Sequence, residues 1–184
     1  IKEIRAILGD FFDIVSLREA GVESDPEETG KTFEENARIK AVAGMKASGM
    51  PCIADDSGLE VLSLDCRPGV MSARYSGSHG DDAANNEKLL AELADKPDRS
   101  ARYVCVICMA FPDGRELEAR GECYGEILKE KRGNGGFGYD PLFYFPQFGK
   151  TFAEISAEEK NEVSHRNAAL KAFEKLWEKE INDK

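Results

Sequence analysis

Hydrophobic and polar positions along the chain predict several amphipathic helices. Residues 1–8 carry apolar side chains at helical spacing. Thr32 and Glu35 have the spacing of a capping box, which predicts a helix from this point to about Ala47, before Gly49.

Further helices are predicted in the second half of the chain. One begins at Asp81 or Asp82 and runs to about Leu93, and Ser156 and Ser164 have the character of helix N-caps. The helix after Ser164 is expected to reach about Glu180. Its predicted inward side chains are Ala169, Phe173, Leu176 and Trp177.

Short apolar runs between these helices predict β-strands. The longest form a hairpin that turns at Pro112-Asp113-Gly114. The expected strands are Phe11–Leu17, Cys52–Ala54, Leu59–Leu64, Arg102–Phe111, Glu116–Ile127 and Leu142–Phe145. The segment Val22–Lys31 is acidic and broken by proline and glycine, so we expect a loop there. The pattern predicts one mixed α/β domain over residues 1–184.

Composition narrows the functional classes. With 25 basic and 35 acidic residues the net charge is −10, which argues against a nucleic-acid surface because phosphate backbones require a basic footprint. No run approaches the ~18 apolar residues of a membrane span, so we expect no membrane association. A small anionic ligand remains possible where local cations or a metal offset the charge.

Cysteine usage indicates a reducing compartment, and we expect a cytoplasmic protein. The five cysteines are an odd number. Cys105 and Cys108 form a C-x-x-C pattern within an apolar strand. Because residues three apart on a strand face opposite sides, we interpret them as core thiols and not as a metal site.

The stretch from Gly133 to Pro141 is the most informative segment. Glycines surround Phe137, so the backbone can approach a ligand closely while the ring stacks on a planar group such as a nucleobase. Its literal G-x-G-x-x-G pattern lacks the following helix of a dinucleotide-binding loop, since Tyr139-Asp140-Pro141 disfavours helix. A glycine-rich surface turn is the alternative.

Two acidic motifs are candidates for a metal site. Asp55-Asp56-Ser57-Gly58 follows a predicted buried strand, at the end where α/β proteins tend to bind ligands. Adjacent carboxylates suit a hard cation such as Mg²⁺, although a solvated Asx turn is the alternative. Glu27-Glu28 precedes the capped helix, where acidic side chains also stabilise the helix dipole.

Candidate cations occur in two places. Lys40 lies on the inward side of its predicted helix, an unusual position for lysine unless it snorkels outward. Lys160, His165 and Arg166 cluster at the start of the terminal helix, where cations oppose the helix dipole but would face a phosphate or a carbonyl oxygen. An ordinary surface helix is the alternative.

Together these groups supply carboxylates for a metal, a candidate base, cations for phosphates and a ring for a nucleobase. They indicate metal-assisted attack of water on a nucleotide phosphate chain. A non-catalytic nucleotide-sensing module and a metal-dependent phosphomonoesterase are the alternative functions.

The chain resembles the inosine/xanthosine triphosphate pyrophosphatases over essentially its whole length. These enzymes hydrolyse deaminated purine triphosphates to the monophosphate and pyrophosphate with Mg²⁺. The motifs that carry the resemblance are Glu-Glu-Thr-Gly-Lys-Thr-Phe-Glu-Glu-Asn-Ala (27–37), Ala-Asp-Asp-Ser-Gly-Leu (54–59), Pro-Gly-Val-Met-Ser-Ala-Arg-Tyr (68–75), Gly-Gly-Phe-Gly-Tyr-Asp-Pro (135–141) and Lys-Asn-Glu-Val-Ser-His-Arg (160–166).

The resemblance implies roles for matching residues. Glu28 and Asp56 would hold Mg²⁺, and Asp56 would also be the general base. The implied substrate-binding residues are Ser57 and Lys40 for the triphosphate, Phe137 with Gly136, Gly138, Tyr139 and Asp140 for the base-stacking loop, and Lys160, His165 and Arg166 for the base pocket. It also implies a homodimer and an elongated α/β fold, with a long twisted mixed sheet flanked by helices and a cleft between two lobes.

Base selectivity has a physical rationale. Donors from Lys160, His165 or Arg166 would satisfy the 6-keto oxygen of inosine or xanthosine but would oppose the amino group of adenosine. Guanine shares the keto group, so its exclusion requires a feature near C2.

The chain departs from the family pattern at its start. The family opens with a strand and a phosphate-binding loop of the form Thr-x-x-Asn-x-x-Lys, whereas Ile1-Lys2-Glu3-Ile4 corresponds to the segment after that lysine. We therefore expect this strand and loop to be missing from residues 1–184, and triphosphate binding to be weak if the physical protein lacks them.

Overall fold

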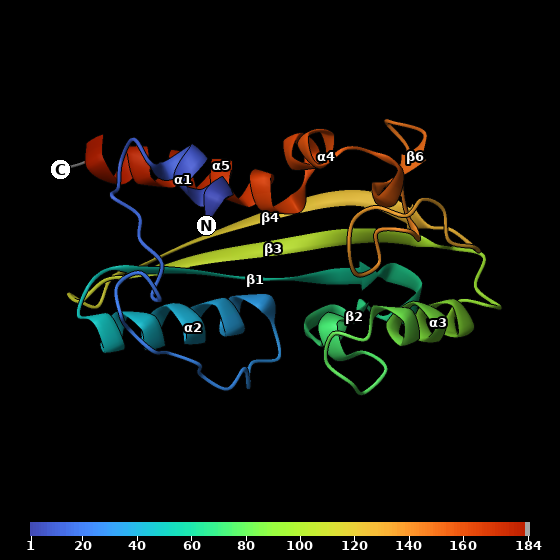
Figure 1. Ribbon diagram of the computed structural model, residues 1–184, viewed down its shortest axis with the longest axis horizontal. Coiled ribbons are helices and arrows are strands. Elements are labelled where there is room, and N and C mark those ends of the chain that lie inside the picture. The colour runs from blue at the N-terminus through green and yellow to red at the C-terminus, as the bar shows by residue number, and fades with distance from the viewer. Residues whose placement is uncertain (183–184) are drawn as a thin grey trace. The chain divides into compact units, whose positions relative to one another are not determined.

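The computed structural model describes residues 1–182, which fold into helices and one set of paired strands (Figure 1). The α-helices are α1 (Lys2–Leu8), α2 (Phe33–Ser48), α3 (Asp82–Glu92), α4 (Ala157–Val163) and α5 (His165–Asn182). The strands are β1 (Cys52–Val61), β2 (Arg67–Pro68), β3 (Ser100–Ala110), β4 (Glu116–Ile127), β5 (Phe143–Phe145) and β6 (Lys150–Thr151). Short 3₁₀ helices are η1 (Leu62–Leu64), η2 (Gly69–Arg74) and η3 (Phe152–Glu154). None of the helices within residues 1–182 combines the length and apolar content needed to cross a bilayer.

The strands pair in the order β2-β1-β3-β4-β5-β6. Glu60 pairs with Pro68 at the β2 edge, and Tyr144 of β5 pairs with both Glu126 and Thr151. The predicted α/β class with a helix-flanked sheet is confirmed. The described sheet is antiparallel, whereas the expectation was a mixed sheet.

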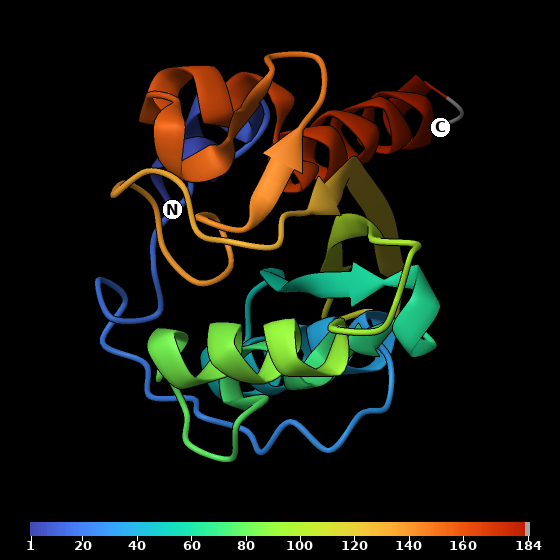
Figure 2. The ribbon, with the colours of Figure 1, turned by 90° about the vertical axis from the view of Figure 1, so that its right-hand side faces the viewer.

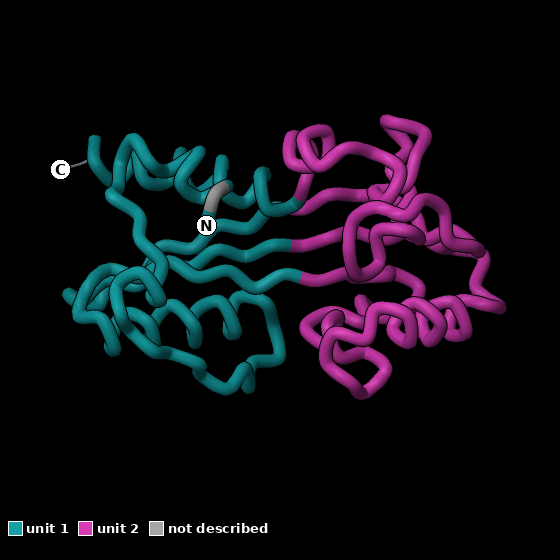
Figure 3. The backbone as a smooth tube through the Cα atoms, in the orientation of Figure 1, with its two compact units in different colours: residues 1–57, 105–121, 165–184 teal, residues 58–104, 122–164 magenta. Residues whose placement is uncertain are grey.

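Contacts divide the chain into two compact units (Figure 3). Unit 1 comprises residues 1–57, 105–121 and 165–184, and unit 2 comprises residues 58–104 and 122–164. The residues of β1, β3 and β4 are therefore divided between the units.

In unit 1, helices lie on opposite sides of the strands: α2 on one side, and α1 with α5 on the other (Figure 1). Both faces of β3 are buried here, which explains its unbroken apolar sequence from Cys105 to Ala110. Gly121 of β4 permits a close approach of α5, because a Cβ at this position would lie 2.1 Å from the backbone nitrogen of Ala169 and 2.3 Å from the carbonyl oxygen of His165. The first turn of α5 is thereby fixed against the sheet.

Unit 2 has its own core, formed mainly by leucines and aromatic rings. Helix α3 lies on one side of its strands, opposite α4 (Figure 2). The ring of Tyr103 lies with its centroid 4.6 Å from that of Phe143 and 5.9 Å from that of Phe152. This aromatic packing is tight enough to bury all three side chains.

Several local predictions are confirmed. Thr32 caps α2 by accepting a hydrogen bond from the Glu35 backbone N–H at 3.2 Å, and Gly49 ends the helix in the left-handed conformation. The Glu35 carboxylate accepts from the backbone N–H of Lys31, so the predicted capping box is only half formed. The β3–β4 hairpin, the start of α3 after Asp81 and the loop over residues 22–31 are as predicted.

Other predictions are wrong. Phe11–Leu17 forms no strand, although Phe12 and Ile14 pack on the core of unit 1. The predicted strands on either side of residues 55–58 are one continuous strand, β1, and residues 62–64 form η1. Leu176 is 41% exposed, while Ala169 and Phe173 are buried as expected and Trp177 packs at the edge of the core.

Candidate active site

An acidic pair and one lysine form a compact cluster in unit 1. The Lys40 Nζ lies 2.8 Å from Asp56 Oδ1 and 2.9 Å from Glu28 Oε1. Asp56 is 9% exposed, whereas the side chains of Lys40 and Glu28 are 25% and 32% exposed, so the cluster is partly open to water. Glu28 and Asp56, which lie 28 positions apart in the sequence, are thus close enough to share one cation.

The electrostatics of this cluster suit proton transfer. Burial raises the pKa of Asp56 above the ordinary value for an aspartate, and this effect outweighs the opposing charge of Lys40. Burial alone would lower the pKa of Lys40, but its hydrogen bonds to Asp56 and Glu28 raise the pKa above the usual lysine value. Lys40 therefore stays charged, while Asp56 is a stronger proton acceptor than an exposed aspartate.

Helix α2 supplies two residues to the cluster, one turn apart. Asn36 is fully buried; its Oδ1 accepts from the backbone N–H of Gly30 at 2.8 Å and its Nδ2 donates to Asp56 Oδ2 at 3.3 Å. Because residues four apart share one helix face, Asn36 and Lys40 both reach Asp56. Asn36 also fixes the chain just after Glu28.

The adjacent carboxylates of β1 have different partners because side chains alternate along a strand. Asp56 pairs with Lys40, whereas Asp55 Oδ2 accepts from Arg166 Nη2 at 2.9 Å and from Ser57 Oγ at 3.3 Å. The two carboxylates thus avoid mutual repulsion by pairing with separate cations. Residues 55–58 lie within a strand and not at its end, so the expected loop position and the Asx-turn alternative are both wrong.

A second cluster lies in unit 2, around the glycine loop. Phe137 is 70% exposed, and the Lys160 Nζ lies 4.3 Å from its ring centroid. Lys160 also donates to Asp140 Oδ2 at 2.5 Å, while the Tyr103 hydroxyl donates to Asp140 Oδ1 at 3.2 Å. With 1% exposure, Asp140 is a buried anchor for the lysine.

The other predicted loop residues have structural contacts. Gly136 adopts φ +72°, and a Cβ at this position would lie 2.2 Å from Asp140 Oδ2. Gly138 has φ +61°. Tyr139 is 4% exposed, and its hydroxyl donates to the carbonyl oxygen of Ser72 at 2.8 Å. The described chain continues from this loop into turns and β5, as the rejection of a dinucleotide-binding loop requires.

The three predicted base-pocket residues belong to different units. Lys160 is in α4 of unit 2, beside Phe137, whereas His165 and Arg166 open α5 in unit 1. Arg166 contacts Asp55 there.

Sequence reasoning gave no site role to the buried asparagines Asn36, Asn85 and Asn86. Asparagine disfavours helix interiors, because its side chain competes for backbone hydrogen bonds. Adjacent asparagines within a helix were therefore an available signal of tertiary hydrogen bonding.

The donors of the acidic cluster fit Mg²⁺ in kind. Mg²⁺ is usually held by one or two carboxylates together with water and substrate phosphates. Glu28 and Asp56 offer two carboxylates, and the position of Lys40 between them shows that the pair attracts positive charge. Within residues 1–182, no three His, Cys, Asp or Glu side chains assemble as a fuller metal shell.

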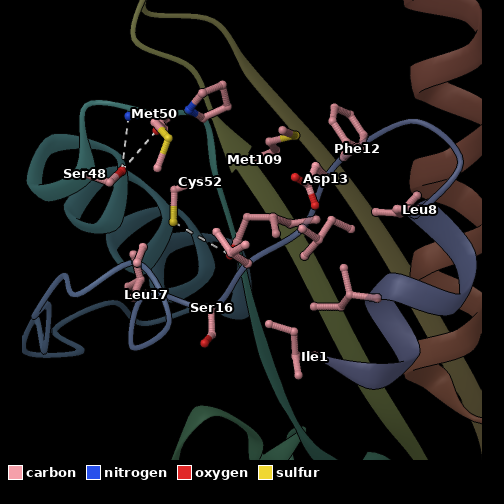
Figure 4. A pocket seen from close by; sticks show the side chains of 16 residues that line it. Ile1, Leu8, Phe12, Asp13, Ser16, Leu17, Ser48, Met50, Cys52 and Met109 are labelled. Carbon is pink, nitrogen blue, oxygen red and sulfur yellow. Dashed lines mark hydrogen bonds between the residues drawn. The ribbon is translucent and has the colours of Figure 1, made fainter.

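A separate cavity of about 300 Å³ lies in unit 1 (Figure 4). It is lined mostly by apolar side chains, among them Leu8, Phe12 and Met109, and none of the residues of the acidic cluster lines it. The candidate active site was therefore identified from its charged side chains, and this cavity is not part of it.

The C-x-x-C pattern consists of core thiols, as predicted. Cys105 and Cys108 are buried and free, and burial raises the pKa of each to about 12. Such thiols stay protonated at neutral pH.

Comparison with known proteins identifies the family. The model of the Ham1 family matches residues 1–176. The chain belongs to the Ham1 family. A Desulfotalea psychrophila protein named dITP/XTP pyrophosphatase is 57% identical over 171 residues, which cover 92% of this chain and 77% of that protein. A Clostridium perfringens protein of the same name is 50% identical over 179 residues, covering 92% and 88%.

Solved Ham1 structures have the same fold. The Staphylococcus aureus Ham1 protein matches with a TM-score of 0.89 and 45% identity, covering 98% of this chain and 93% of that one. A Ham1 protein from Coxiella burnetii matches with a TM-score of 0.88 and 42% identity, covering 97% and 92%.

Proposed function

We propose that this Ham1 protein is a Mg²⁺-dependent pyrophosphatase that hydrolyses deaminated purine triphosphates (ITP, dITP and XTP) to the monophosphate and pyrophosphate. The cluster of Glu28, Lys40 and Asp56 is the observation that carries this proposal. It provides carboxylates, a fixed cation and a base with a raised pKa in a chain similar to proteins named dITP/XTP pyrophosphatase. Removing deaminated nucleotides in this way would cleanse the nucleotide pool.

In this proposal, Asp56 is the general base. It accepts a proton from water while the water oxygen bonds to the phosphorus nearest the ribose. The bond from that phosphorus to the bridging oxygen breaks, and pyrophosphate leaves. Asn36 and Lys40 hold the Asp56 carboxylate in place during this transfer.

Glu28 and Asp56 would hold Mg²⁺, which when bound neutralises charge on the phosphate oxygens. Lys40 and Ser57 are the proposed phosphate ligands. The Ser57 hydroxyl lies with Asp55 on the face of β1 opposite Asp56, so it would contact the phosphates from outside the acidic cluster.

The proposed base site is Phe137 with its glycine loop. Lys160 covers one face of the ring, and the high exposure of Phe137 leaves surface for a purine to stack on. Gly136, Gly138, Tyr139 and Asp140 shape this loop.

Discrimination against adenine would come from donors to the 6-keto oxygen. Lys160 is one proposed donor, and Asp140 holds its ammonium beside the Phe137 ring. His165 and Arg166 remain proposed donors, with Arg166 oriented by Asp55.

Release of pyrophosphate from ITP, XTP, GTP and ATP, with and without Mg²⁺, tests the function. We expect Mg²⁺-dependent pyrophosphate from ITP and XTP, little from ATP, and loss of turnover in Asp56→Asn. Unchanged base preference in both Lys160→Met and Arg166→Ala would dismiss the donor role.

The alternatives give different results in the same assay. A nucleotide-sensing module would bind ITP without turnover, and a phosphomonoesterase would release orthophosphate. The carboxylate cluster favours hydrolysis over sensing, because binding a base alone requires only the Phe137 loop.

We also propose a cytoplasmic homodimer. The five free cysteines fit a reducing compartment. Sedimentation at several concentrations tests the dimer, and cell fractionation tests the location.

A further inference from the structure

Both polar backbone atoms of Gly138 are held by the first turns of α3. The Gly138 N–H donates to Asp82 Oδ2 at 2.7 Å, and the Gly138 carbonyl oxygen accepts from Asn86 Nδ2 at 2.8 Å. Asp82 and Asn86 are four residues apart, so they share one face of the helix. One face of α3 thus holds the backbone of Gly138, the residue that follows Phe137, by two hydrogen bonds.

The amide of Asn86 can make these contacts in one orientation only. Asn86 is 2% exposed, and its Nδ2 donates to the carbonyl oxygens of both Asp82 and Gly138. Exchanging the amide oxygen and nitrogen would set three oxygens against one another, because carbonyl groups cannot donate. The hydrogen bond from Asn86 to Gly138 therefore requires an amide N–H at this position, and a side chain of the same shape without that donor could not replace it.

A third hydrogen bond holds the backbone of Phe137 itself. The Phe137 backbone N–H donates to Asp140 Oδ2 at 3.0 Å, and Asp140 is itself anchored by Tyr103 and Lys160. The backbone is thus fixed at Phe137 and Gly138, although the Phe137 ring is 70% exposed. An exposed ring on a fixed backbone is a pre-organised stacking surface, which lowers the entropic cost of binding a planar ligand.

We infer that Asp82 and Asn86 are positioning residues that orient the Phe137 ring for the purine of the substrate. This inference rests on the proposed function and extends it to two residues that do not touch the substrate. The acidic cluster belongs to unit 1 and these residues to unit 2. Substitution of Asp82 or Asn86 is therefore expected to affect recognition of the base and not recognition of the phosphates.

Asn86→Asp is the sharpest test, because it keeps the side-chain shape but replaces the donor with an acceptor. The matched control is Asn85→Asp. Asn85 is equally buried at 2% exposure, but it bonds to Ser76 and Ala73 and not to the glycine loop. Asp82→Ala is the second test variant, at an exposed position where folding is not endangered.

The measurements are steady-state release of pyrophosphate from ITP, and inhibition of that reaction by inorganic tripolyphosphate, which has no base. We expect KM for ITP to rise about tenfold in Asn86→Asp and Asp82→Ala, with kcat and the inhibition constant of tripolyphosphate little changed. Asn85→Asp should leave both constants near wild type, even if its melting temperature falls as far as that of Asn86→Asp.

Unchanged KM for ITP in both test variants would overturn the inference, as would parallel increases in KM and the tripolyphosphate constant. If the wild-type protein releases no pyrophosphate from ITP, the proposed function fails. Titration with inosine monophosphate then decides the positioning role, since weaker binding to Asn86→Asp than to Asn85→Asp supports it and equal binding refutes it.

Discussion

The Lys40 ammonium and the Asp56 carboxylate form an ion pair at 2.8 Å, with both side chains mostly buried. Glu28 Oε1 lies 2.9 Å from the same nitrogen, so Lys40 forms ion pairs with two carboxylates. A pair in water would contribute little, but in this position neither carboxylate can lose its cation without an electrostatic cost.

Replacing Lys40 should make the fold depend on metal. In Lys40→Met the two carboxylates lose their shared cation, and we expect the free energy of unfolding to fall by about 1–3 kcal/mol. Mg²⁺ should restore part of this loss by binding the two carboxylates that have lost their lysine. Urea unfolding with and without Mg²⁺ measures the effect. Arg38→Met is the matched control, because Arg38 lies on the same helix but pairs with Glu116 at the surface, and its loss should change stability little.

The acid limb of the pH–rate profile should report Asp56. Burial raises the pKa of Asp56 in the metal-free protein, whereas bound Mg²⁺ would lower it, so kcat/KM for ITP should fall at acid pH through a value that decreases as Mg²⁺ is added. Asp56→Asn should lower kcat by about 10²–10⁴ and remove this limb. A limb that survives in the residual activity of Asp56→Asn would show that another group is the base.

The same raised pKa predicts a stability trade-off at this residue. A carboxyl with a raised pKa in the folded state stabilises the fold fully below its unfolded pKa, and that contribution is lost as the pH rises through the folded pKa. At neutral pH, Asp56→Asn should therefore be at least as stable as wild type while being inactive. Thermal unfolding at neutral and acidic pH checks the sign, and a large loss of stability confined to neutral pH would contradict it.

Removing Lys160 should leave a buried charge unpaired. Asp140 is 1% exposed, so Lys160→Met is expected to cost about 3–5 kcal/mol in the free energy of unfolding. The double variant Lys160→Met/Asp140→Asn should recover part of this loss, because it removes the unpaired charge as well. A double-mutant cycle measured by urea unfolding gives the coupling energy between Lys160 and Asp140. Strictly additive losses of stability would show that the two residues are not coupled.

Thiol reactivity should divide the cysteines by burial. Burial raises the pKa of Cys105, Cys108 and Cys123 to about 12, whereas Cys66 is partly exposed. At neutral pH an alkylating reagent should modify Cys66 first and the three buried thiols only after unfolding. Mass spectrometry of native and urea-treated protein identifies the modified residues.

Local signals in the sequence predicted much of the fold. The Thr32 cap and the Pro112-Asp113-Gly114 turn act within a few residues, so they can be recognised without knowing the rest of the chain. The strand over residues 52–61 was predicted as two separate strands because polar residues 55–57 interrupt its apolar pattern. Those residues remain in the strand because their tertiary partners, Lys40 and Arg166, satisfy their charges.

The site could be predicted only in part, because some of its side chains depend on partners that are distant in the sequence. Glu28, Lys40 and Asp56 were expected to act together, and the structure brings them together. The partnership of Asp55 with Arg166 could not be predicted, since it joins residues 111 positions apart. The same holds for Asn86 and Gly138, which are separated by 52 positions.

The division of the strands between the units has a consequence for synthesis on the ribosome. Every segment of unit 2 has been translated once residue 164 is added, whereas unit 1 still lacks α5 and its buried side chains Ala169, Leu170 and Phe173. Unit 1, which carries the acidic pair, therefore cannot complete its core until α5 has been translated. A nascent chain thus has every residue of unit 2, Phe137 among them, before it has all the buried side chains of unit 1.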